Sequence, residues 1–239
     1  MSRLAHALVC VGVLLLAGCT PAARHAARPH RAPPPRAIVD ALAAREAAMP
    51  GLRLSMTVKT TGTGRDSLLA SPAYLAIDDT GGIRLQVLSP FGVTVLDLAI
   101  RNEVYTLTMP LTHESRDGTV DLRTLSDPAI PIGDRMIVAL ALMFRPKAHP
   151  ETCRGAGSSA VTCAVGSGVT ATVTVDERLR PEREVYRDAA GTPLLGATFG
   201  GYRGEDARAQ PGSLLIEDTA SGARMAIQVT RVRTAAAPS

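Results

Sequence analysis

Several stretches of the chain alternate between apolar and polar residues, the period-two pattern of a β-strand with one buried face. The strictest alternation runs over 52–59, and a second run covers 169–175. Further apolar segments are separated by turns that contain Gly, Pro or Asp. Together these patterns predict about ten strands. Besides the two runs already named, the strands are expected at 67–78, 83–88, 93–100, 104–109, 183–187, 193–202, 213–219 and 224–233.

The segment Ile83–Ile100 predicts a hairpin with an unusual tip. Two runs rich in Leu, Ile and Val flank the sequence Ser-Pro-Phe-Gly at 89–92, and neighbouring Pro and Gly supply the backbone angles of a tight turn. A turn tip normally faces water, yet Phe91 is one of only three Phe in the chain. Its ring either folds back onto the core or projects as a wedge into something apolar.

Two segments predict helices. The first, Ile38–Met49, places its apolar residues toward one side and is stopped by a Pro-Gly pair. The second, Ile132–Arg145, is apolar on all sides from 136 to 144. A helix without a polar face is buried on every side or covers something apolar. It is therefore either a central core helix or a lid whose Met136 and Met143 adapt to acyl chains.

The order of these elements predicts the fold class. The segments 111–130 and 154–162 are expected to be irregular, the second as a Gly/Ser/Ala-rich loop. The remaining pattern indicates an α+β, mainly β fold, a single unclosed antiparallel β-barrel covered by a few helices. A curled sheet with few aromatic residues and an apolar helix across its mouth can enclose an apolar cavity.

The first 18 residues have the three parts of an export signal, namely an early Arg, a short apolar run and small residues before a Cys. The apolar run is too short for a permanent membrane span, which needs about 20 residues. The sequence Leu-Ala-Gly-Cys at 16–19 resembles the bacterial lipobox, in which the signal is cut before a diacylated Cys. We therefore predict that Cys19 is lipidated and anchors the chain. Thr20, and not Asp, follows the Cys, which resembles the signal that sorts lipoproteins of enteric bacteria to the outer membrane.

Four parts of the chain follow from these boundaries. Residues 1–18 are the predicted lipoprotein signal peptide, and 19–36 hold the lipidated Cys and a tether rich in Pro, Ala, Arg and His. Such a composition is typical of an extended, semi-rigid linker. Residues 37–234 form the predicted folded domain, and 235–239 a disordered tail.

Composition narrows the function classes. Nucleic-acid-binding proteins usually carry clustered basic residues interleaved with aromatic ones. The net charge of this chain is only +4 and its aromatic content 3%, which argues against that class. Cys153 and Cys163 remain after signal removal and lipidation, in an exported and oxidising setting, and they flank a small-residue loop. They predict a disulfide, because a zinc site needs more ligands than two Cys. We expect neither a metal nor a cofactor.

No catalytic constellation can be assembled from the sequence. The chain contains no G-x-S-x-G, no H-E-x-x-H and no phosphate-binding G-x-x-x-x-G-K-[ST]. His113 and His149 are isolated, and Asp78 and Asp79 lead into a Gly-Gly turn. The expected function is therefore not enzymatic.

The P-x-G hairpin tip and the segment 129–145, A-I-P-I-G-D-R-M-I-V-A-L-A-L-M-F-R, resemble LolB. That family is the outer-membrane receptor that takes lipoproteins from a periplasmic carrier and inserts them into the membrane. Phe91 matches the exposed apolar residue at the family's P-L-G tip, and Pro131 with the helix after it matches the lid. The resemblance extends from Ile38 onward, most clearly to Arg145. It implies an unclosed barrel whose cavity holds acyl chains. The related carrier LolA has no lipid anchor, so Cys19 favours the receptor.

The resemblance implies a lipid-anchored monomer at the periplasmic face of the outer membrane. Its partners would be lipoprotein acyl chains or phospholipid, and a LolA-type carrier; Phe91 would insert into the membrane. The alternative is a structural or interaction lipoprotein that docks a partner protein, carries no lipid and is packed solid inside. Under the first hypothesis the cavity is lined by Leu85, Val87, Leu96, Leu98, Met136, Leu140 and Met143.

Overall fold

The computed structural model describes residues 32–62, 69–125, 132–144, 146–204 and 209–234. The chain divides into two compact units, Met1–Ala32 and Pro33–Ser239, and the helices and strands below belong to the second. The predicted signal segment, Cys19, most of the tether, Pro131 and the tail 235–239 lie outside the described residues.

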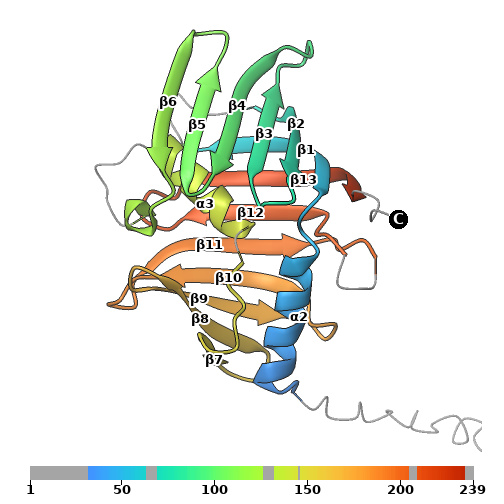
Figure 1. Cartoon of the computed structure of the whole chain (residues 1–239), viewed down its shortest axis with the longest axis vertical. Helices are drawn as coiled ribbons and strands as arrows, with labels where there is room; N and C mark the ends of the chain where they lie inside the picture. The colour runs from blue at the N-terminus through green and yellow to red at the C-terminus, as the bar shows by residue number, and fades with distance from the viewer. Residues whose placement is uncertain (1–31, 63–68, 126–131, 145, 205–208, 235–239) are drawn as a thin grey trace, which may run out of the picture. The chain divides into compact units, whose positions relative to one another are not determined.

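One antiparallel sheet holds all the described strands, in the order β6-β5-β4-β3-β2-β1-β13-β12-β11-β10-β9-β8-β7 (Figure 1). Consecutive strands pair, except that β6 and β7 are the two edges, so the curled sheet stays unclosed as predicted. The strands are β1 (Leu52–Thr61), β2 (Ser71–Ile77), β3 (Ile83–Leu88), β4 (Thr94–Arg101), β5 (Val104–Met109), β6 (Glu114–Thr119), β7 (Cys153–Gly155), β8 (Ala160–Gly166), β9 (Val169–Val175), β10 (Pro181–Arg187), β11 (Pro193–Gly200), β12 (Ser213–Asp218) and β13 (Arg224–Thr234).

The first and last strands lie side by side at the centre of the sheet. Leu52 of β1 pairs with Thr234 of β13, and the pairing continues to Thr61 and Arg224. Successive side chains of a strand point to opposite faces, and the burial of β1 follows that rule, with Leu52, Leu54, Met56 and Val58 on the buried face. The sheet therefore has an apolar inner face and a polar outer face.

The two segments expected to be irregular hold three strands instead: β6 lies in the first, and parts of β7 and β8 lie in the second. β6 reads ESRDGT and is exposed over most of its length, and β7 pairs with β8 across the small-residue turn 156–159. Neither β6 nor β7 shows the period-two pattern, because an edge strand can form by backbone pairing on one side without burying a face. Together with β8, they raise the described sheet from the ten predicted strands to 13.

The described helices are α2 (Pro35–Ala47) and α3 (Ile132–Met143), with a short 3₁₀ turn, η2 (Leu122–Leu125). α2 begins at Pro35 rather than at the predicted Ile38, because a Pro in the first turn lacks an N–H that would in any case have no helical partner. α3 ends at Met143, two residues before the predicted end.

α3 lies in the main core, inside the curve of the sheet. Its residues from Arg135 to Met143 are all buried, and they pack in one cluster with inner-face residues of β1–β5 and β9–β13. The start of the helix is fixed by an ion pair, since Nη2 of Arg135 donates to Asp218 of β12 over 2.7 Å and to the carbonyl of Leu125 over 3.2 Å. The apolar helix is thus enclosed on all sides, the first of the two alternatives for it.

α2 packs on the strands of the second half of the sheet (Figure 1). It buries Ile38, Val39 and Leu42 in a separate apolar cluster. The partners of these side chains are Ala148 and four inner-face residues of β8 and β9: Val161, Cys163, Val173 and Val175. α2 therefore covers part of the inner face as a second, smaller layer beside α3.

Candidate functional site

An apolar pocket of about 80 Å³ lies between α2, the end of α3 and the inner face of the sheet. Its walls come from elements that are far apart in the sequence, namely α2, the residues after α3, and strands β1 and β10–β13. The lining is mostly apolar: Leu42, Met49, Leu54, Met56, Met143, Phe144, Pro181, Phe199, Pro211, Leu214, Ile227 and Val229. Arg45, Glu46, Lys147, Glu184, Tyr202 and Gln210 complete it.

One polar wall of the pocket is a stack of charged groups on an aromatic ring. The guanidinium carbons of Arg45 and Arg180 lie 5.3 and 4.9 Å from the centroid of Tyr202, a distance at which a cation is attracted to the ring face. The Tyr202 hydroxyl donates to the carbonyl of Pro181 over 2.7 Å. Burial raises the pKa of Tyr202 far above its usual value, so the hydroxyl stays protonated. Arg180 is also paired with Asp176 over 2.7 Å, and Arg45 donates to the carbonyl of Ala209 over 2.7 Å, so both guanidinium groups have polar partners besides the ring.

A second polar part of the lining is a buried ion pair. Nζ of Lys147 lies 3.1 Å from Oε2 of Glu184 and donates to the carbonyl of Leu142 over 3.3 Å. The hydroxyl of Tyr186 donates to the same carboxylate over 2.9 Å. Burial, followed by the charge of Glu184, raises the pKa of Tyr186 well above its usual value. The Glu184 carboxylate of β10 therefore lies between two donors, close to the last turn of α3.

Glu46 ties the end of α2 to the segment that follows α3. Its carboxylate accepts hydrogen bonds from the backbone N–H groups of Lys147, over 3.0 Å, and Ala148, over 3.1 Å. We call this contact the Glu46 latch. Because both partners of the latch flank the pocket, the contact holds α2 over it.

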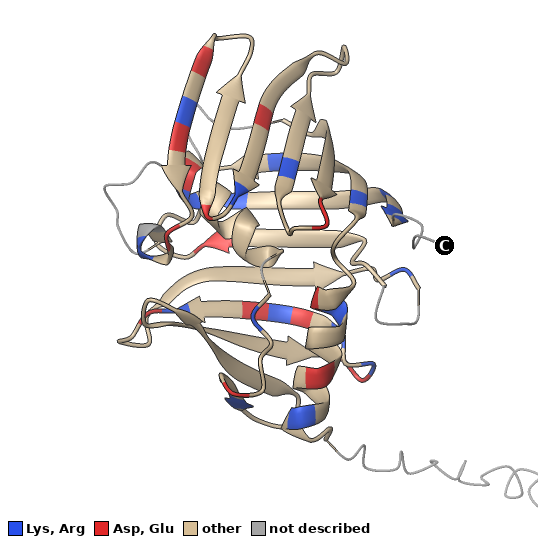
Figure 2. Cartoon of the chain, in the orientation of Figure 1, with Lys and Arg blue, Asp and Glu red and all other residues tan. Residues whose placement is uncertain are grey.

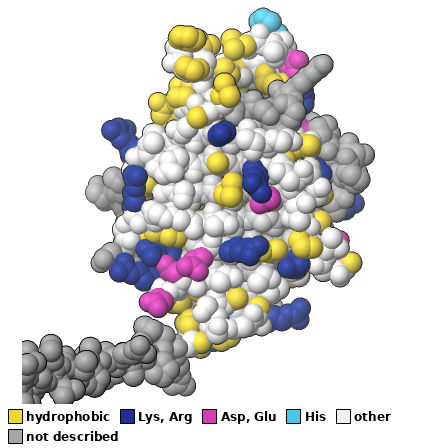
Figure 3. All heavy atoms as spheres, turned by 180° about the vertical axis from the view of Figure 1, so that it is seen from behind, with side chains coloured by type: hydrophobic (Ala, Val, Ile, Leu, Met, Phe, Trp, Pro, Cys, Tyr) yellow, Lys and Arg dark blue, Asp and Glu magenta, His cyan; other side chains and the backbone are white. Residues whose placement is uncertain are grey.

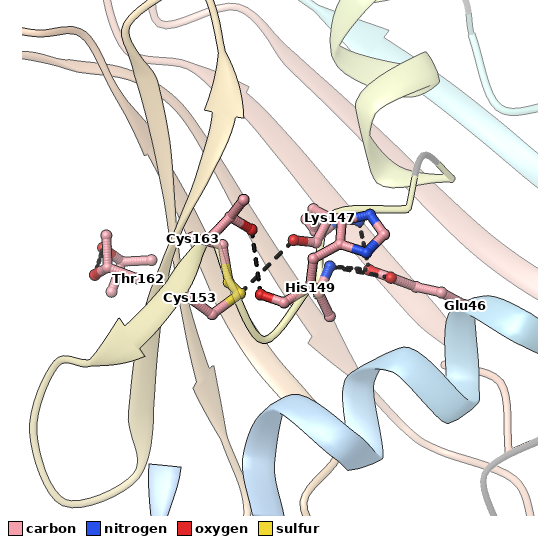
Figure 4. The surroundings of a disulfide bond; sticks show 9 residues. Glu46, Lys147, His149, Cys153, Thr162 and Cys163 are labelled. Atoms are coloured by element: carbon pink, nitrogen blue, oxygen red, sulfur yellow. Dashed lines mark hydrogen bonds between the residues drawn. A yellow bond between two sulfur atoms is a disulfide. The ribbon is translucent and has the colours of Figure 1, made fainter. Parts of the chain in front are cut away.

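The disulfide predicted from the sequence is present beside the latch. Cys153 and Cys163 are directly opposite in β7 and β8 and are joined by a bond with sulfurs 2.02 Å apart. Figure 4 shows the segment from Lys147 to His149 passing between the disulfide and Glu46. The backbone N–H of Cys153 donates to the carbonyl of His149 over 3.1 Å. The segment 147–149 thus contacts both β7, through Cys153, and α2, through Glu46.

The pocket has a mouth toward solvent. Glu46, Met49 and Phe144 line both the pocket and an open hollow of about 770 Å³. That hollow is bounded by the β2–β3 turn at Asp78–Gly82 and the β4–β5 turn at Arg101–Glu103. Ligand pockets usually measure about 300–1,000 Å³. The pocket is therefore nearly closed in this conformation, and a long apolar ligand enters only if the side chains at the mouth or α2 itself move.

A second apolar feature lies at the other ends of the strands, away from the turns that bound this hollow. In an antiparallel meander, every second connection lies at the same ends of the strands. The β1–β2 connection, the β3–β4 turn and the β5–β6 turn are therefore on the same side. We call their exposed apolar residues the apolar rim. They are Leu69, Phe91, Val93 and Leu111, with exposed fractions of 82, 93, 50 and 61%. Figure 3 shows hydrophobic side chains gathered at the upper end of the view.

The β3–β4 turn holds Phe91 away from the core. The N–H of Gly92 donates to the carbonyl of Ser89 over 2.9 Å, and the N–H of Ser89 to the carbonyl of Val93 over 2.8 Å. Gly92 has a φ of +81°, a conformation that Gly adopts without steric cost. The ring of Phe91 consequently projects into solvent, so the alternative in which it folds onto the core does not occur.

The seven residues predicted to line a cavity lie on the inner face or in α3, and among them Met143 lines the pocket. Leu85, Val87, Leu98, Met136 and Leu140 are packed in the main core, and Leu96 is partly buried against it. The physical reason is that α3 fills the space between the strands of the first half, which leaves the pocket on the side of β10–β13. A role for these residues in holding a ligand stays a prediction.

The charged residues around the pocket were not identified from the sequence. Glu46, Lys147 and Glu184 come from three different elements, and no local pattern links them. Arg45 does carry a signal, because it follows Ile38 and Leu42 at helical spacing and so lies on the buried side of α2. Among the described residues no group of three or more His, Cys, Asp and Glu is placed to hold a metal ion. Nor does that part of the chain include a helix of the length and apolarity needed to cross a bilayer.

Three solved structures are similar to this chain in fold. One, described as an outer membrane lipoprotein-sorting protein domain from Vibrio parahaemolyticus, has a TM-score of 0.55 at 14% identity, covering 85% of this chain and 93% of its own. A LolA superfamily protein from Nitrosomonas europaea has a TM-score of 0.53 at 11% identity, covering 87% and 96%. This chain has the LolA-type fold. A DUF1329 family protein from Desulfovibrio piger, with a TM-score of 0.55 at 10% identity over 86% and 95%, shares it.

The LolA-type fold confirms the architecture that the sequence and its resemblance implied, an unclosed antiparallel barrel around helices. No family model matches the sequence, and no curated protein matches it in sequence either. The likeness therefore concerns the fold, and the function has to be argued from the pocket and the apolar rim.

Proposed function

We propose that this chain is an envelope lipoprotein that binds acyl chains of lipoproteins or phospholipids in its pocket and passes them to the outer membrane through its apolar rim. The observation that carries the proposal is the apolar pocket beneath α2. It has a largely apolar lining, a mouth toward solvent and a closing helix whose end is held by the Glu46 latch. Displacing that helix would extend the pocket along the inner face.

The apolar rim supports the delivery step. A single Phe side chain moved from water into an apolar medium gains about 1.5–3 kcal/mol, which orients a tethered domain but does not anchor it. Leu69, Val93 and Leu111 enlarge the surface that can meet lipid. Exposed apolar residues grouped on neighbouring turns mark a membrane or partner contact in soluble domains.

The N-terminal segment supports the location. Lipidation of Cys19 would hold the folded unit near the membrane through more than one acyl chain, which gives stable anchoring. Mass spectrometry of the mature N-terminus, comparing the natural chain with Cys19→Ser, checks this part of the proposal separately.

Ligand binding is tested with a matched pair of variants on β12. Leu214 lines the pocket, whereas Leu215 is on the outer face. We expect full-length protein to bind a fluorescent fatty acid, Leu214→Phe to weaken binding at least fivefold because the larger ring fills the pocket, and Leu215→Phe to bind as the natural chain does. Equal binding by all three would overturn a ligand site at this position.

The delivery step is tested at the rim with Phe91→Glu. Val104→Glu is the control, because Val104 is 49% exposed and begins β5, at the strand ends away from the rim. Phe91→Glu should lose transfer of a labelled lipoprotein to vesicles while its thermal unfolding midpoint is unchanged. If native preparations carry no lipid and both variants behave alike, the alternative function is favoured, an interaction lipoprotein that docks a partner protein.

A further inference from the structure

Four arginines gather on the outer face of the sheet, away from the pocket and the apolar rim. Arg53 of β1 lies directly opposite Arg233 of β13, and Arg231 lies opposite Ser55 one step along the same pair of strands. Arg84 of β3 is in the same row, two strands away, because Arg53 pairs with Ala76 and Ala76 with Arg84. We call these four residues the basic cluster. Figure 2 shows basic residues at the start of β1, on β3 and at the end of β13.

The basic cluster surrounds a shallow hollow of about 330 Å³. Tyr74 and Gln86 line it together with the four arginines, and the ring of Tyr74 is 50% exposed. No Asp or Glu is among the described residues that line it. The hollow therefore presents guanidinium groups around a half-exposed aromatic ring.

The charge of the cluster is only partly neutralised. Arg84 forms a bidentate pair with Asp97, at 3.1 and 2.6 Å. Arg53, Arg231 and Arg233 make no ion pair with any carboxylate in the described part of the chain. Like charges directly opposite on neighbouring strands are destabilising, so the Arg53–Arg233 register works against the stability of the central strand pair. An anionic partner would relieve that repulsion.

The position of the cluster decides which kind of anion fits. Arg53 and Arg84 are the second residues of their strands, whereas Phe91 follows the end of β3. At about 3.3 Å per residue the cluster is on the order of 20 Å from the tip of the β3–β4 turn. A membrane that meets the strands end-on at the apolar rim lies about that distance from the cluster. With the rim in lipid in that orientation, the basic cluster is left free on the outer face for a partner in the aqueous phase.

We propose that the basic cluster is the docking surface for a carboxylate-rich segment of a partner protein. Guanidinium groups bind carboxylates through two parallel hydrogen bonds, and Tyr and Arg are the residues that contribute most at protein interfaces. The choice of protein over lipid rests on the proposed membrane contact of the rim. The binding of an anion at this surface does not depend on it.

A single fluorophore in the hollow reports binding there. The chain contains no Trp, so Tyr74→Trp in the full-length protein, held in phosphatidylcholine vesicles, gives one emitter at the site. We expect its emission to change saturably with a 15-residue poly-glutamate peptide and the response to weaken as salt is raised. A poly-lysine peptide of equal length should leave the emission unchanged.

Charge-matched variants identify the residues involved. Arg53→Gln, Arg231→Gln and Arg233→Gln combined should raise the dissociation constant for poly-glutamate at least tenfold. The control removes the same charge from exposed residues elsewhere, Lys59→Gln, Arg154→Gln and Arg183→Gln, and should change it less than twofold. Arg233→Gln alone, near the end of β13, provides a milder variant should the triple substitution impair folding, and we expect a threefold or greater loss from it.

Three results would overturn the proposal. The first is an unchanged affinity in the cluster variants, and the second is an equal loss in the control. The third is an emission change of Trp at position 74 in vesicles containing phosphatidylglycerol without any response to poly-glutamate, which would assign the surface to lipid. A parallel Phe91→Trp chain reports rim insertion by its own blue shift, so failure of the membrane contact is seen independently of the docking surface.

Discussion

The carboxylate of Glu46, near the end of α2, accepts a hydrogen bond from the backbone N–H of Lys147 over 3.0 Å. These two residues are about a hundred positions apart in the sequence, and their contact joins the helix that covers the pocket to the segment leaving α3. Lys147 also contributes its side chain to the buried pair with Glu184. One short segment therefore controls both how α2 is held and how the polar wall of the pocket is neutralised.

Removing the latch should loosen α2. We expect Glu46→Ala to lower the free energy of unfolding by about 1–3 kcal/mol, because two partly buried N–H groups lose their acceptor. Hydrogen exchange of the α2 amides should accelerate, and binding of a fluorescent fatty acid should become faster. Asp40→Ala is the control, since Asp40 is exposed on the same helix, and it should change stability by less than about 0.5 kcal/mol. Unaltered exchange in α2 would show that Glu46 does not hold the helix.

The buried pair should behave as a unit. Lys147→Met or Glu184→Gln alone leaves a polar group without its partner, and breaking a buried ion pair lowers stability by about 3–5 kcal/mol. The double variant should be more stable than the Lys147→Met chain, because no charge is then left buried and unpaired. Urea denaturation of all four chains gives the coupling. Additive losses would mean that the two groups do not interact.

The disulfide should stabilise the edge beneath α2. It closes a loop with a sequence separation of 10, which corresponds to about 2–3 kcal/mol in the unfolded chain. Replacing both cysteines by Ala should lower the unfolding midpoint, and adding a reductant to the natural chain should lower it equally. The reductant should have no further effect on the double variant. A reductant effect that persists without Cys153 and Cys163 would point to another cause.

Acid should weaken the wall that holds Tyr202. Burial alone would raise the pKa of Asp176, but hydrogen bonds from Arg180 and Arg178 outweigh it and lower the pKa. A hydrogen bond from Arg84 likewise lowers the pKa of Asp97. Because each folded pKa lies below the unfolded value of about 3.9, both carboxylates stabilise the fold above that pH and lose this effect as the pH falls through the folded pKa.

The free energy of unfolding should therefore be nearly constant from pH 7 to about 5 and fall below about pH 4. Asp176→Asn removes one of these titrations, so its stability should be lower at neutral pH and decline less steeply in acid. Denaturation measured across that range provides the comparison. A parallel decline in both chains would show that Asp176 makes no contribution.

The alternation of side chains was sufficient to predict most of the sheet. Leu52, Leu54, Met56 and Val58 are buried as their spacing requires, because a strand exposes its two faces in turn whatever its partner is. The hairpin at 83–100 and the burial of the apolar helix could be anticipated on the same local grounds. Three strands, β6, β7 and β8, were not predicted; β6 and β7 are the edge strands, which need no buried face.

By itself, the sequence determined which residues face inward, where the chain turns, that Phe91 occupies a turn tip and which two cysteines could pair. Only the tertiary structure decided that β1 lies beside β13, that α2 covers the second half of the sheet, and that the pocket lies there. It also decided that Arg53 meets Arg233. The physical reason is that local periodicity encodes the face of each element, whereas its partners are chosen by backbone pairing and packing over the whole chain.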